Sequence, residues 1–496
     1  MATTSIQESS IQGSLYELVA RGQKDIFFVR DISSSYHPYS ARYDSVVPYI
    51  CERRTTVPLN APTFGNTFEI PLEPYGDILT EVNLLIELPT WIPPIQYFNT
   101  TTNPRRVNNY YWIVDDVSSS YGYVNVPGYF LFEKIQFYQD QILLQEWSGD
   151  SLLVTGLTEG TWNSEFLALA EAGQIGALGS ADARATALRA TPGKLRIKLP
   201  VVGCQVAGDP GFPLCCATNQ NYRFRIKLRS LQDLVVGVDV SGIPISNPQP
   251  WTRPYFQYIQ EGQVVPTTFT PIGISSIGQP TILLETSQAY VPIEVKDDLR
   301  DEHINIPFRR QFENIFTMGP LDYKPFDVGA GAEDRVVAVT RRLDARHPCE
   351  RLVFFFRGQD CIGTHRLDNF VNSIGTQGGQ FYNNLKLIIA GQDREYLFDS
   401  LVWQYLNAHA KDDRDTGLNI GKMRWSLGDV YERVKPAPRQ PEGTINFTTA
   451  DRPTLYIELQ DVLIGDIGKR TEMRVFMEGW GVYEFVKGRG RMVFAN

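Results

Sequence analysis

The sequence predicts an all-β protein made of two antiparallel β-sandwiches in tandem, and three observations lead to this prediction. The 496 residues exceed one typical domain, and because a sandwich can span roughly 200 to 250 residues, two fit the length. Aromatic residues make up 12% of the chain, and its 31 Pro and 40 Gly are scattered along it, which favours short strands joined by turns. In the clearest segments apolar and charged residues alternate, as they do when one face of a strand is buried.

Two segments show this alternation most strictly, residues 194–199 and residues 222–229. In each, apolar residues occupy every second position and Lys or Arg mostly fills the positions between, so one face enters a core and the other meets water. Further strands are expected at residues 82–88, 130–138, 335–341, 352–356, 385–389, 455–459 and 475–485. These segments rarely alternate with long helical patterns, so a parallel βαβ architecture is not expected.

Two segments have a helical pattern, and both lie in long connections between expected strands. Residues 164–190 are rich in Ala and Leu behind Ser164, a residue type that caps helices. Residues 397–411 would place one apolar face along a helix, made of Leu397, Leu401, Val402, Tyr405 and Leu406.

Landmarks recur in the same order in the two halves of the chain. The strand at 224–228 leads into Gln232 and Asp233, and the strand at 455–459 leads into Gln460 and Asp461. An apolar strand also leads into a Gln-Asp pair at 139–140 and again at 392–393. This order predicts two copies of one sandwich.

A proline-rich stretch at 241–280 separates the two copies. We therefore expect an N-terminal arm, a first sandwich, a linker, and a second sandwich with the C-terminal tail. The expected boundaries are 1–41, 42–242, 243–280 and 281–496.

Composition restricts the function classes. The chain is 43% hydrophobic, enough for sizeable cores, and its net charge of -9 argues against a polyphosphate as the main partner. No uncharged apolar run reaches the roughly 18 residues that cross a bilayer. The polar start, residues 1–10, lacks the order of a secretory signal, and Ala2 leaves no N-terminal Gly for myristoylation, so we expect synthesis in the cytosol.

Six cysteines are too few for a disulfide framework in a chain of this length. We expect reduced thiols in the cores. Cys215 and Cys216 are adjacent and cannot easily reach unstrained disulfide geometry, so we expect each to pack separately.

The motifs of nucleotide and metal chemistry are incomplete. Residues 417–422 resemble a phosphate loop but have one residue too few between the glycines, and Met423 follows the lysine in place of a hydroxyl. Cys361 and His365 are four residues apart, but two ligands bind zinc poorly, so structural packing is expected. The acidic cluster Asp412, Asp413 and Asp415 lacks the later glutamate of a calcium loop.

Signals for hydrolysis are also weak. Gly273, Ser275, Ser276 and Gly278 are misspaced by one residue for a nucleophile elbow. The 56 Asp and Glu leave carboxylate pairs for glycoside hydrolysis open. We predict no catalytic, cofactor-binding or metal-binding residue.

Basic side chains form rows at Lys194, Arg196 and Lys198 and along residues 223–229. These rows fit either a nucleic-acid surface or a solvated sheet face balanced by acids. We favour the second, with Glu69, Glu73, Glu81 and Glu87 as the balancing acids. Like charges directly opposite each other on neighbouring strands are destabilising, so the two rows are not adjacent or acidic strands separate them.

An ordered set of short motifs resembles the major capsid proteins of nucleocytoplasmic large DNA viruses. The set covers nearly the whole chain: residues 17–25 (ELVARGQKD), 71–79 (PLEPYGDIL), 212–214 (FPL), His347 with Pro348, 391–394 (GQDR), 446–448 (NFT) and 494–496 (FAN). The sequence departs from the family pattern at Ala390, Glu442 and Thr448, where the family has Asn, Ser and Ser.

This resemblance implies two eight-stranded antiparallel jelly rolls with long loops and short helical insertions. Three chains would form a pseudo-hexagonal capsomer of an icosahedral shell, in the virion capsid and assembled in the host cytoplasm. Implied partners are neighbouring capsomers, minor capsid proteins and an inner membrane, without direct nucleic-acid binding. The alternatives are a capsid paralogue, minor or penton-associated, or a carbohydrate-binding or glycosidase β-sandwich.

The resemblance also assigns the long loops to the outer surface and the polar arm before Tyr36 to the underside. These loops are expected at residues 89–128, 148–192, 358–381 and 407–443. Residues 99–109 should be the most protease-accessible, with cleavage at Arg105 or Arg106 before Arg21 or Lys24. Asn99 and Asn446 begin glycosylation sequons, and the sequence leaves their modification open.

Overall fold

The structure is a computed structural model, and the fold concerns the residues that it describes. These are residues 49–89, 106–107, 110–114, 120–124, 126–159, 194–205, 209–217, 219–238, 245–247, 255–259, 271–272, 278–318, 337–344, 346–358, 362–363, 365, 367, 382–403, 420–425, 443–459 and 471–493.

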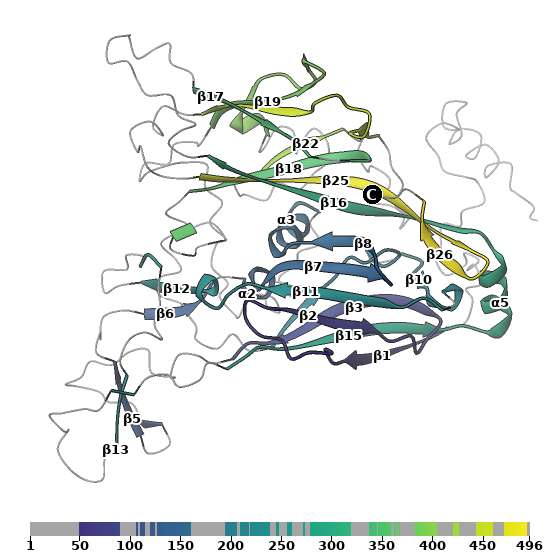
Figure 1. Cartoon of the computed structure of the whole chain (residues 1–496), viewed down its shortest axis with the longest axis horizontal. Coiled ribbons are helices and arrows are strands. Elements are labelled where there is room, and N and C mark those ends of the chain that lie inside the picture. Colours follow the sequence, from purple (N-terminus) through teal and green to yellow (C-terminus); the bar gives the residue numbers. More distant parts are fainter. Residues whose placement is uncertain are drawn as a thin grey trace, which may run out of the picture. The chain divides into compact units, whose positions relative to one another are not determined.

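The first sandwich consists of two antiparallel sheets (Figure 1). One has the order β1 (Ile50–Thr56), β15 (Thr281–Tyr290), β3 (Ile78–Glu87) and β9 (Lys194–Lys198), and short β10 (Phe212–Pro213) also pairs with β3. The other has the order β2 (Thr67–Leu72), β11 (Tyr222–Leu228), β7 (Phe132–Gln139) and β8 (Ile142–Trp147).

The second sandwich repeats this plan. One sheet has the order β16 (Ile304–Met318), β25 (Thr471–Val486), β18 (Pro348–Gly358) and β22 (Ile420–Arg424), with β23 (Ile445–Asn446) on β18 and β26 (Arg489–Met492) on β25. The other has the order β17 (Val337–Arg342), β24 (Thr454–Leu459) and β19 (Tyr382–Ile389), with β20 (Gln392–Asp393) and β21 (Phe398–Asp399) on β19.

Both sandwiches therefore have one topology. Numbered along the chain within each sandwich, the main strands lie in the order first, eighth, third, sixth in one sheet and second, seventh, fourth, fifth in the other. This is the strand order of a jelly roll, so the predicted fold class is confirmed. The predicted repeat is visible at the hairpin after the fourth strand, where Asp140 and Ala390 both have positive φ, 52° and 54°.

Strand pairing changes two expected boundaries. β15 was expected to begin the second sandwich, but it pairs with β1 and β3 and is the last strand of the first. The expected linker contains β13 (Tyr255–Ile259) and β14 (Pro271–Ile272), and β13 pairs with β5 (Tyr110–Val114) from the loop between β3 and β7. That loop also contains β4 (Arg106–Val107), which pairs with β5, and β6 (Ser120–Tyr123), which pairs with β12 (Val235–Val238). The stretch is thus an insertion before the last strand of the first sandwich.

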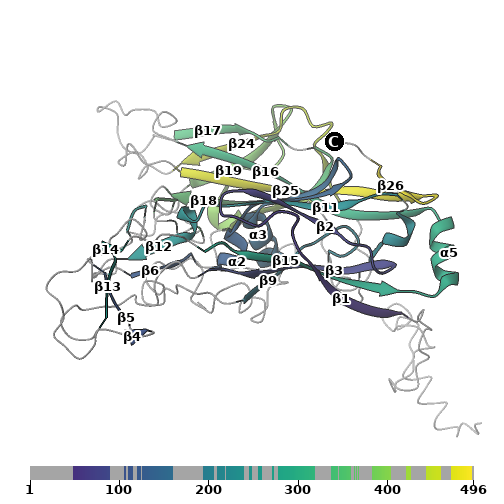
Figure 2. The ribbon, with the colours of Figure 1, turned by 60° about the horizontal axis from the view of Figure 1, so that its bottom comes forward.

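Helices are few and short. They are α2 (Pro127–Phe130), α3 (Gly149–Glu159), η3 (Leu214–Cys216), η4 (Gln232–Leu234) and α5 (Ile293–Asp301), which connects β15 to β16 (Figure 2). α3 occupies the start of an expected loop.

The two expected helices have different outcomes. The helix expected from Leu397 was placed wrongly at its start, because residues 398–399 form β21 and helical structure begins at Ser400. Residues 404–411 and the helix expected at 164–190 lie outside the described residues, as do Arg105, Asn99 and the N-terminal arm.

The basic rows and the cysteines follow the favoured interpretation where the structure describes them. β9 and β11 lie in different sheets, and Arg196 pairs with Glu81 at 3.7 Å while Arg223 pairs with Glu69 at 3.7 Å. Free thiols are buried at Cys204, Cys215, Cys216 and Cys349, whereas Cys51 is exposed. The sulfur atoms of the adjacent pair, Cys215 and Cys216, are 3.9 Å apart, in contact but unbonded.

Two apolar clusters fill the sandwiches. The core of the second sandwich includes Leu352, Phe354 and Phe356 from one face of β18. The opposite face of β18 contributes Val353 and Phe355 to the core cluster of the first sandwich. The β16–β25–β18–β22 sheet is therefore buried on both faces, and its outer face packs against the first sandwich.

Candidate functional site: a buried charged contact between the sandwiches

Helix α3 lies where the first sandwich meets the outer face of the β16–β25–β18–β22 sheet (Figure 1). An ion cluster is centred on Asp150 at the start of this helix. Asp150 is 0% exposed. Its Oδ2 accepts hydrogen bonds from Arg229, after β11, and from Arg474 of β25, each at 2.7 Å. Its Oδ1 accepts one from Arg357 of β18. One carboxylate of the first sandwich thus binds two arginines of the second.

The charges within this cluster are compensated. Burial alone would raise the pKa of Asp150, but the attraction of the three arginines outweighs it and holds the pKa below its usual range. Arg474 also pairs with Glu313 of β16 at 2.9 Å and with Glu472. Burial raises the pKa of Glu313 despite that arginine. The cluster therefore combines three guanidinium groups with three carboxyl groups.

A second buried pair extends the contact along β25. Arg351 donates to both carboxylate oxygens of Glu478, at 2.6 and 2.9 Å, in a bidentate geometry that fixes both side chains. Thr155 of α3 donates to Glu478 at 3.3 Å. This links the helix of the first sandwich to the second a turn and a half beyond Asp150.

At the other end of the contact, neutral groups join the sandwiches. Tyr483 of β25 donates its hydroxyl hydrogen to Gln139 of β7 at 2.6 Å and lies 3.0 Å from the hydroxyl of Tyr222. Gln139 donates in turn to the carbonyl oxygen of Gly490 at 2.8 Å. Burial raises the pKa values of Tyr222 and Tyr483, so both hydroxyls stay protonated.

This arrangement positions domains and is poorly suited to acid or base chemistry. The buried carboxylates of Asp150, Glu478 and Glu350 each pair with an arginine; for Glu350 this is Arg309, at 2.9 Å. Such pairs are costly to remove from water and are stable only in one geometry. Of these three carboxylates, Asp150 is the one whose arginines Arg357 and Arg474 belong to the other sandwich, so its cluster favours one relative orientation of the two sandwiches.

The candidate motifs of the sequence do not assemble a site in the described part of the chain. Residues 420–422 of the phosphate-loop candidate lie in strand β22, so Lys422 is on a strand and not between a loop and a helix. His365 has its Nδ1 2.9 Å from the carbonyl oxygen of Val235. Cys361, the aspartates at 412–415 and residues 273–276 lie outside the described residues. No group of three or more His, Cys, Asp or Glu that could hold a metal occurs among the residues described.

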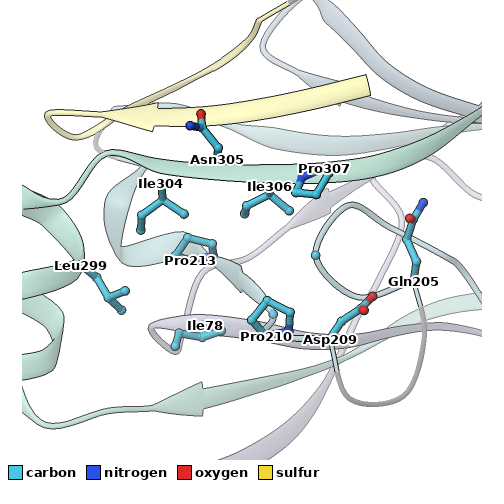
Figure 3. A pocket seen from close by; sticks show the side chains of 12 residues that line it. Ile78, Gln205, Asp209, Pro210, Pro213, Leu299, Ile304, Asn305, Ile306 and Pro307 are labelled. Carbon is cyan, nitrogen blue, oxygen red and sulfur yellow. The ribbon is translucent and has the colours of Figure 1, made fainter. Parts of the chain in front are cut away.

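A cavity of about 320 Å³ lies beside the start of β16 (Figure 3). Its wall is mainly aliphatic, with Ile78, Leu299, Ile304 and Ile306 among the side chains shown. Asp209 is the only ionisable residue among the described lining residues, and the amide of Gln205 bonds the backbone of Arg309. The described lining therefore contains no pair of ionisable groups.

The ion cluster predicts a specific dependence of stability on pH. An unfolded Asp has a pKa near ~3.9, and the folded pKa of Asp150 is lower, so its charge stabilises the fold above that value and the contribution is lost as pH falls below it. We expect the difference in unfolding free energy between the wild type and Asp150→Asn to stay constant from about pH 8 to 5 and to shrink below about pH 4. Urea unfolding at each pH measures this difference. A difference that grows on acidification would contradict the assignment of Asp150 as a charged centre.

Comparisons with known proteins agree with this architecture. No protein-family model matches the sequence. Over 116 residues the chain is 30% identical to the major capsid protein of Chrysochromulina ericina virus, a match that covers 22% of this chain and 18% of that protein. The chain thus spans about a fifth of the length of the curated relative that it matches.

Solved structures extend the similarity to the whole fold. VP54 of PBCV-1, fitted into a reconstruction of the virophage Sputnik, matches with a TM-score of 0.62 and 12% identity, covering 92% of this chain and 100% of that one. The Faustovirus major capsid protein matches with a TM-score of 0.52 and 11% identity, covering 93% and 94%. The predicted resemblance to capsid proteins of large DNA viruses and the double jelly-roll fold are both confirmed.

In the part of the chain that the structure describes, no helix has the length and apolar character needed to cross a bilayer.

Proposed function

We propose that this chain is a major capsid protein of a large DNA virus and that its role is structural and not enzymatic. One observation carries the proposal: two jelly rolls of the same strand order are joined by a buried charged contact, in which Asp150 of the first pairs with Arg357 and Arg474 of the second. A shell tile needs domains of constant relative orientation, because small angular errors accumulate over many copies. The similarity to capsid proteins in sequence and in fold supports the same role.

The repeated domain supports a trimer. Two similar jelly rolls in each of three chains give six similar units around one axis, which is the pseudo-hexagonal capsomer of an icosahedral shell. We propose an N-terminal arm at 1–41, a first jelly roll that extends through β15 to about residue 291, and a second that begins near β16, with α5 as the connection.

The proposal also covers the chain's location and its partners. We propose that the chain is made in the host cytoplasm and resides in the virion capsid, where it contacts neighbouring capsomers, minor capsid proteins and an inner membrane. We propose no direct contact with nucleic acid, because the net charge of -9 opposes it and the basic rows pair with acids.

The mass in solution tests this proposal. We expect the purified protein to form a particle of about three times the chain mass of 56.2 kDa, measured by light scattering coupled to size exclusion. Electron microscopy of concentrated samples should show pseudo-hexagonal particles. A monomer throughout the micromolar range would contradict the trimer, and binding to a glycan array would favour the carbohydrate-binding alternative.

A further inference from the structure

The contact between the two sandwiches of one chain is made by α3 of the first sandwich and the outer sheet face of the second. Because the two sandwiches have the same topology, each of these surfaces has an equivalent in the other sandwich. The outer face of the second sandwich's β16–β25–β18–β22 sheet receives α3, the segment that follows the fifth strand of the first sandwich. The corresponding outer face of the first sandwich is the β1–β15–β3–β9 sheet. The corresponding segment of the second sandwich begins at Asp399, the last residue of β21, and continues into the helical turn that starts at Ser400. Leu401 is the exposed apolar residue of this segment, and Tyr396, Leu397 and Phe398, just before it, are exposed as well.

A shared β-bulge aligns the two sheet faces residue by residue. In the first sandwich the extra residue of the third strand is Thr80, between Leu79 and Glu81. In the second it is Glu350, between Cys349 and Arg351. Five residues beyond each bulge, Leu85 pairs with Leu283, and Phe355 pairs with Arg474. Leu283 therefore occupies the position of Arg474.

Strand pairing and helix caps align the two inserted segments. Trp147 pairs with Ile135, four residues before the end of β7, and Phe398 pairs with Leu385, four residues before the end of β19.

The next residue caps a helical turn in each case. Ser148 Oγ accepts from the amide of Ser151 at 3.1 Å, and Asp399 Oδ1 accepts from the amide of Val402 at 2.9 Å. Asp150, which contacts the other sandwich, lies two residues after its cap Ser148. Leu401 lies two residues after its cap Asp399, so Leu401 corresponds to Asp150.

In the two alignments a charged pair in one place corresponds to an apolar pair in the other. Within the chain, Asp150 and Arg474 form a charged pair at 2.7 Å. Their counterparts, Leu401 and Leu283, are both apolar. Asp150 is 0% exposed, whereas Leu401 is 51% exposed, so only the charged position is covered within the chain.

We propose that a second copy of this chain covers Leu401, by seating it on Leu283 and Leu85 of its β1–β15–β3–β9 face. The proposal rests on the proposed function, because three such contacts alternate with the three contacts inside the chains and close a ring of six jelly rolls. Arg196 of β9 flanks the seat beside Leu85, and its guanidinium group already pairs with Glu285 and Glu81 of the same sheet.

The test replaces the apolar pair of Leu401 and Leu283 by an Asp and an Arg, the pair that Asp150 and Arg474 form within the chain. Leu401→Asp should place an unpaired carboxylate in the interface and raise the dissociation constant of the trimer by roughly 100-fold or more. Leu283→Arg alone should weaken it similarly. The double variant Leu401→Asp/Leu283→Arg recreates the Asp150–Arg474 pair and should recover most of the affinity. Light scattering over a dilution series measures each constant, and circular dichroism checks that each variant is folded.

The control is Ile142→Asp, which alters a residue of similar exposure at the start of β8, outside the proposed contact, and should leave the trimer unchanged. A trimeric wild type that Leu401→Asp leaves intact would overturn this inference and leave the proposed capsomer standing. Loss of the trimer in both single variants without recovery in the double variant would overturn the pairing of Leu401 with Leu283. A monomeric wild type would overturn the interface and the capsomer together.

Discussion

Replacing Asp150 by Asn is expected to lower the free energy of unfolding by about 3–5 kcal/mol. Asn has nearly the shape of Asp, so the change removes charge with little change in packing. The three arginines around this position would keep their positive charges in a buried site, where the Arg357 side chain is 1% exposed, and would lose the one carboxylate that pairs with all three, leaving only Glu313 and Glu472. An amide hydrogen of Asn would also point toward guanidinium hydrogens. Urea unfolding at matched protein concentration, followed by tryptophan fluorescence, measures the loss.

The matched control is an ion pair on the surface. Lys227 and Glu133 are 2.6 Å apart, with side chains 45% and 47% exposed. Glu133→Gln should change the unfolding free energy by less than about 1 kcal/mol, because water screens the pair. Equal effects of the two substitutions would show that the Asp150 cluster is solvated, and the contact would then not fix the orientation of the sandwiches.

Much of the fold could be predicted because it depends on local patterns. Alternation along β9 and β11 identifies strands with one buried face, and the burial of Leu195 and Phe224 agrees with it. The repeat was detectable because similar strands recur in the same order, although the Gln-Asp pairs at the fourth strands are not equivalent: Gln139 precedes the hairpin turn and Gln392 follows it. The alternation within a strand depends only on residues that are close together in the chain, so it can be recognised in a single sequence.

Sheet membership was harder to predict, because it depends on contacts that are distant in the sequence. β15 resembles many other strands of the chain, and nothing in its residues indicates that it pairs with β1 and β3, about 190 to 240 residues earlier. The prolines before it suggested a linker, whereas they belong to an insertion whose β13 pairs with β5. Proline marks an interruption of regular structure but does not tell which domain is interrupted.

The charged contact was missed for a similar reason. Asp150 meets its arginines across 79, 207 and 324 residues of sequence, so no motif spacing contains the cluster. α3 was also hidden, because its sequence includes two Gly and two Thr, which favour helix weakly. One signal could have been used: the charged residues Glu472, Arg474, Glu478 and Glu484 all lie on one face of the mainly apolar β25, which indicates a buried polar face.

Replacing Gly149 by Ala is expected to prevent normal packing of α3 and to cost at least about 3 kcal/mol, the upper end of what overpacking causes. A methyl group at this position would lie 1.9 Å from the carbonyl oxygen of Tyr129 and 2.8 Å from that of Phe132. Both are backbone atoms, so no side chain can rotate away, and α3 must move together with Asp150. The charged contact would then lose its geometry as well as its close packing.

Gly363→Ala is the control for this substitution, because among the described residues no atom beyond the chain neighbours lies within 4 Å of the added methyl group. It should change the unfolding free energy by less than about 1 kcal/mol. The midpoint of urea unfolding and the yield of soluble folded protein compare the two variants. Gly149→Ala should shift the midpoint strongly or leave no folded protein. Adding Leu401→Asp and Leu283→Arg should not restore folding, because the defect lies within one chain. If Gly149→Ala unfolds at the same urea concentration as Gly363→Ala, α3 does not approach the end of α2 as closely as described, and the position of Asp150 must be revised.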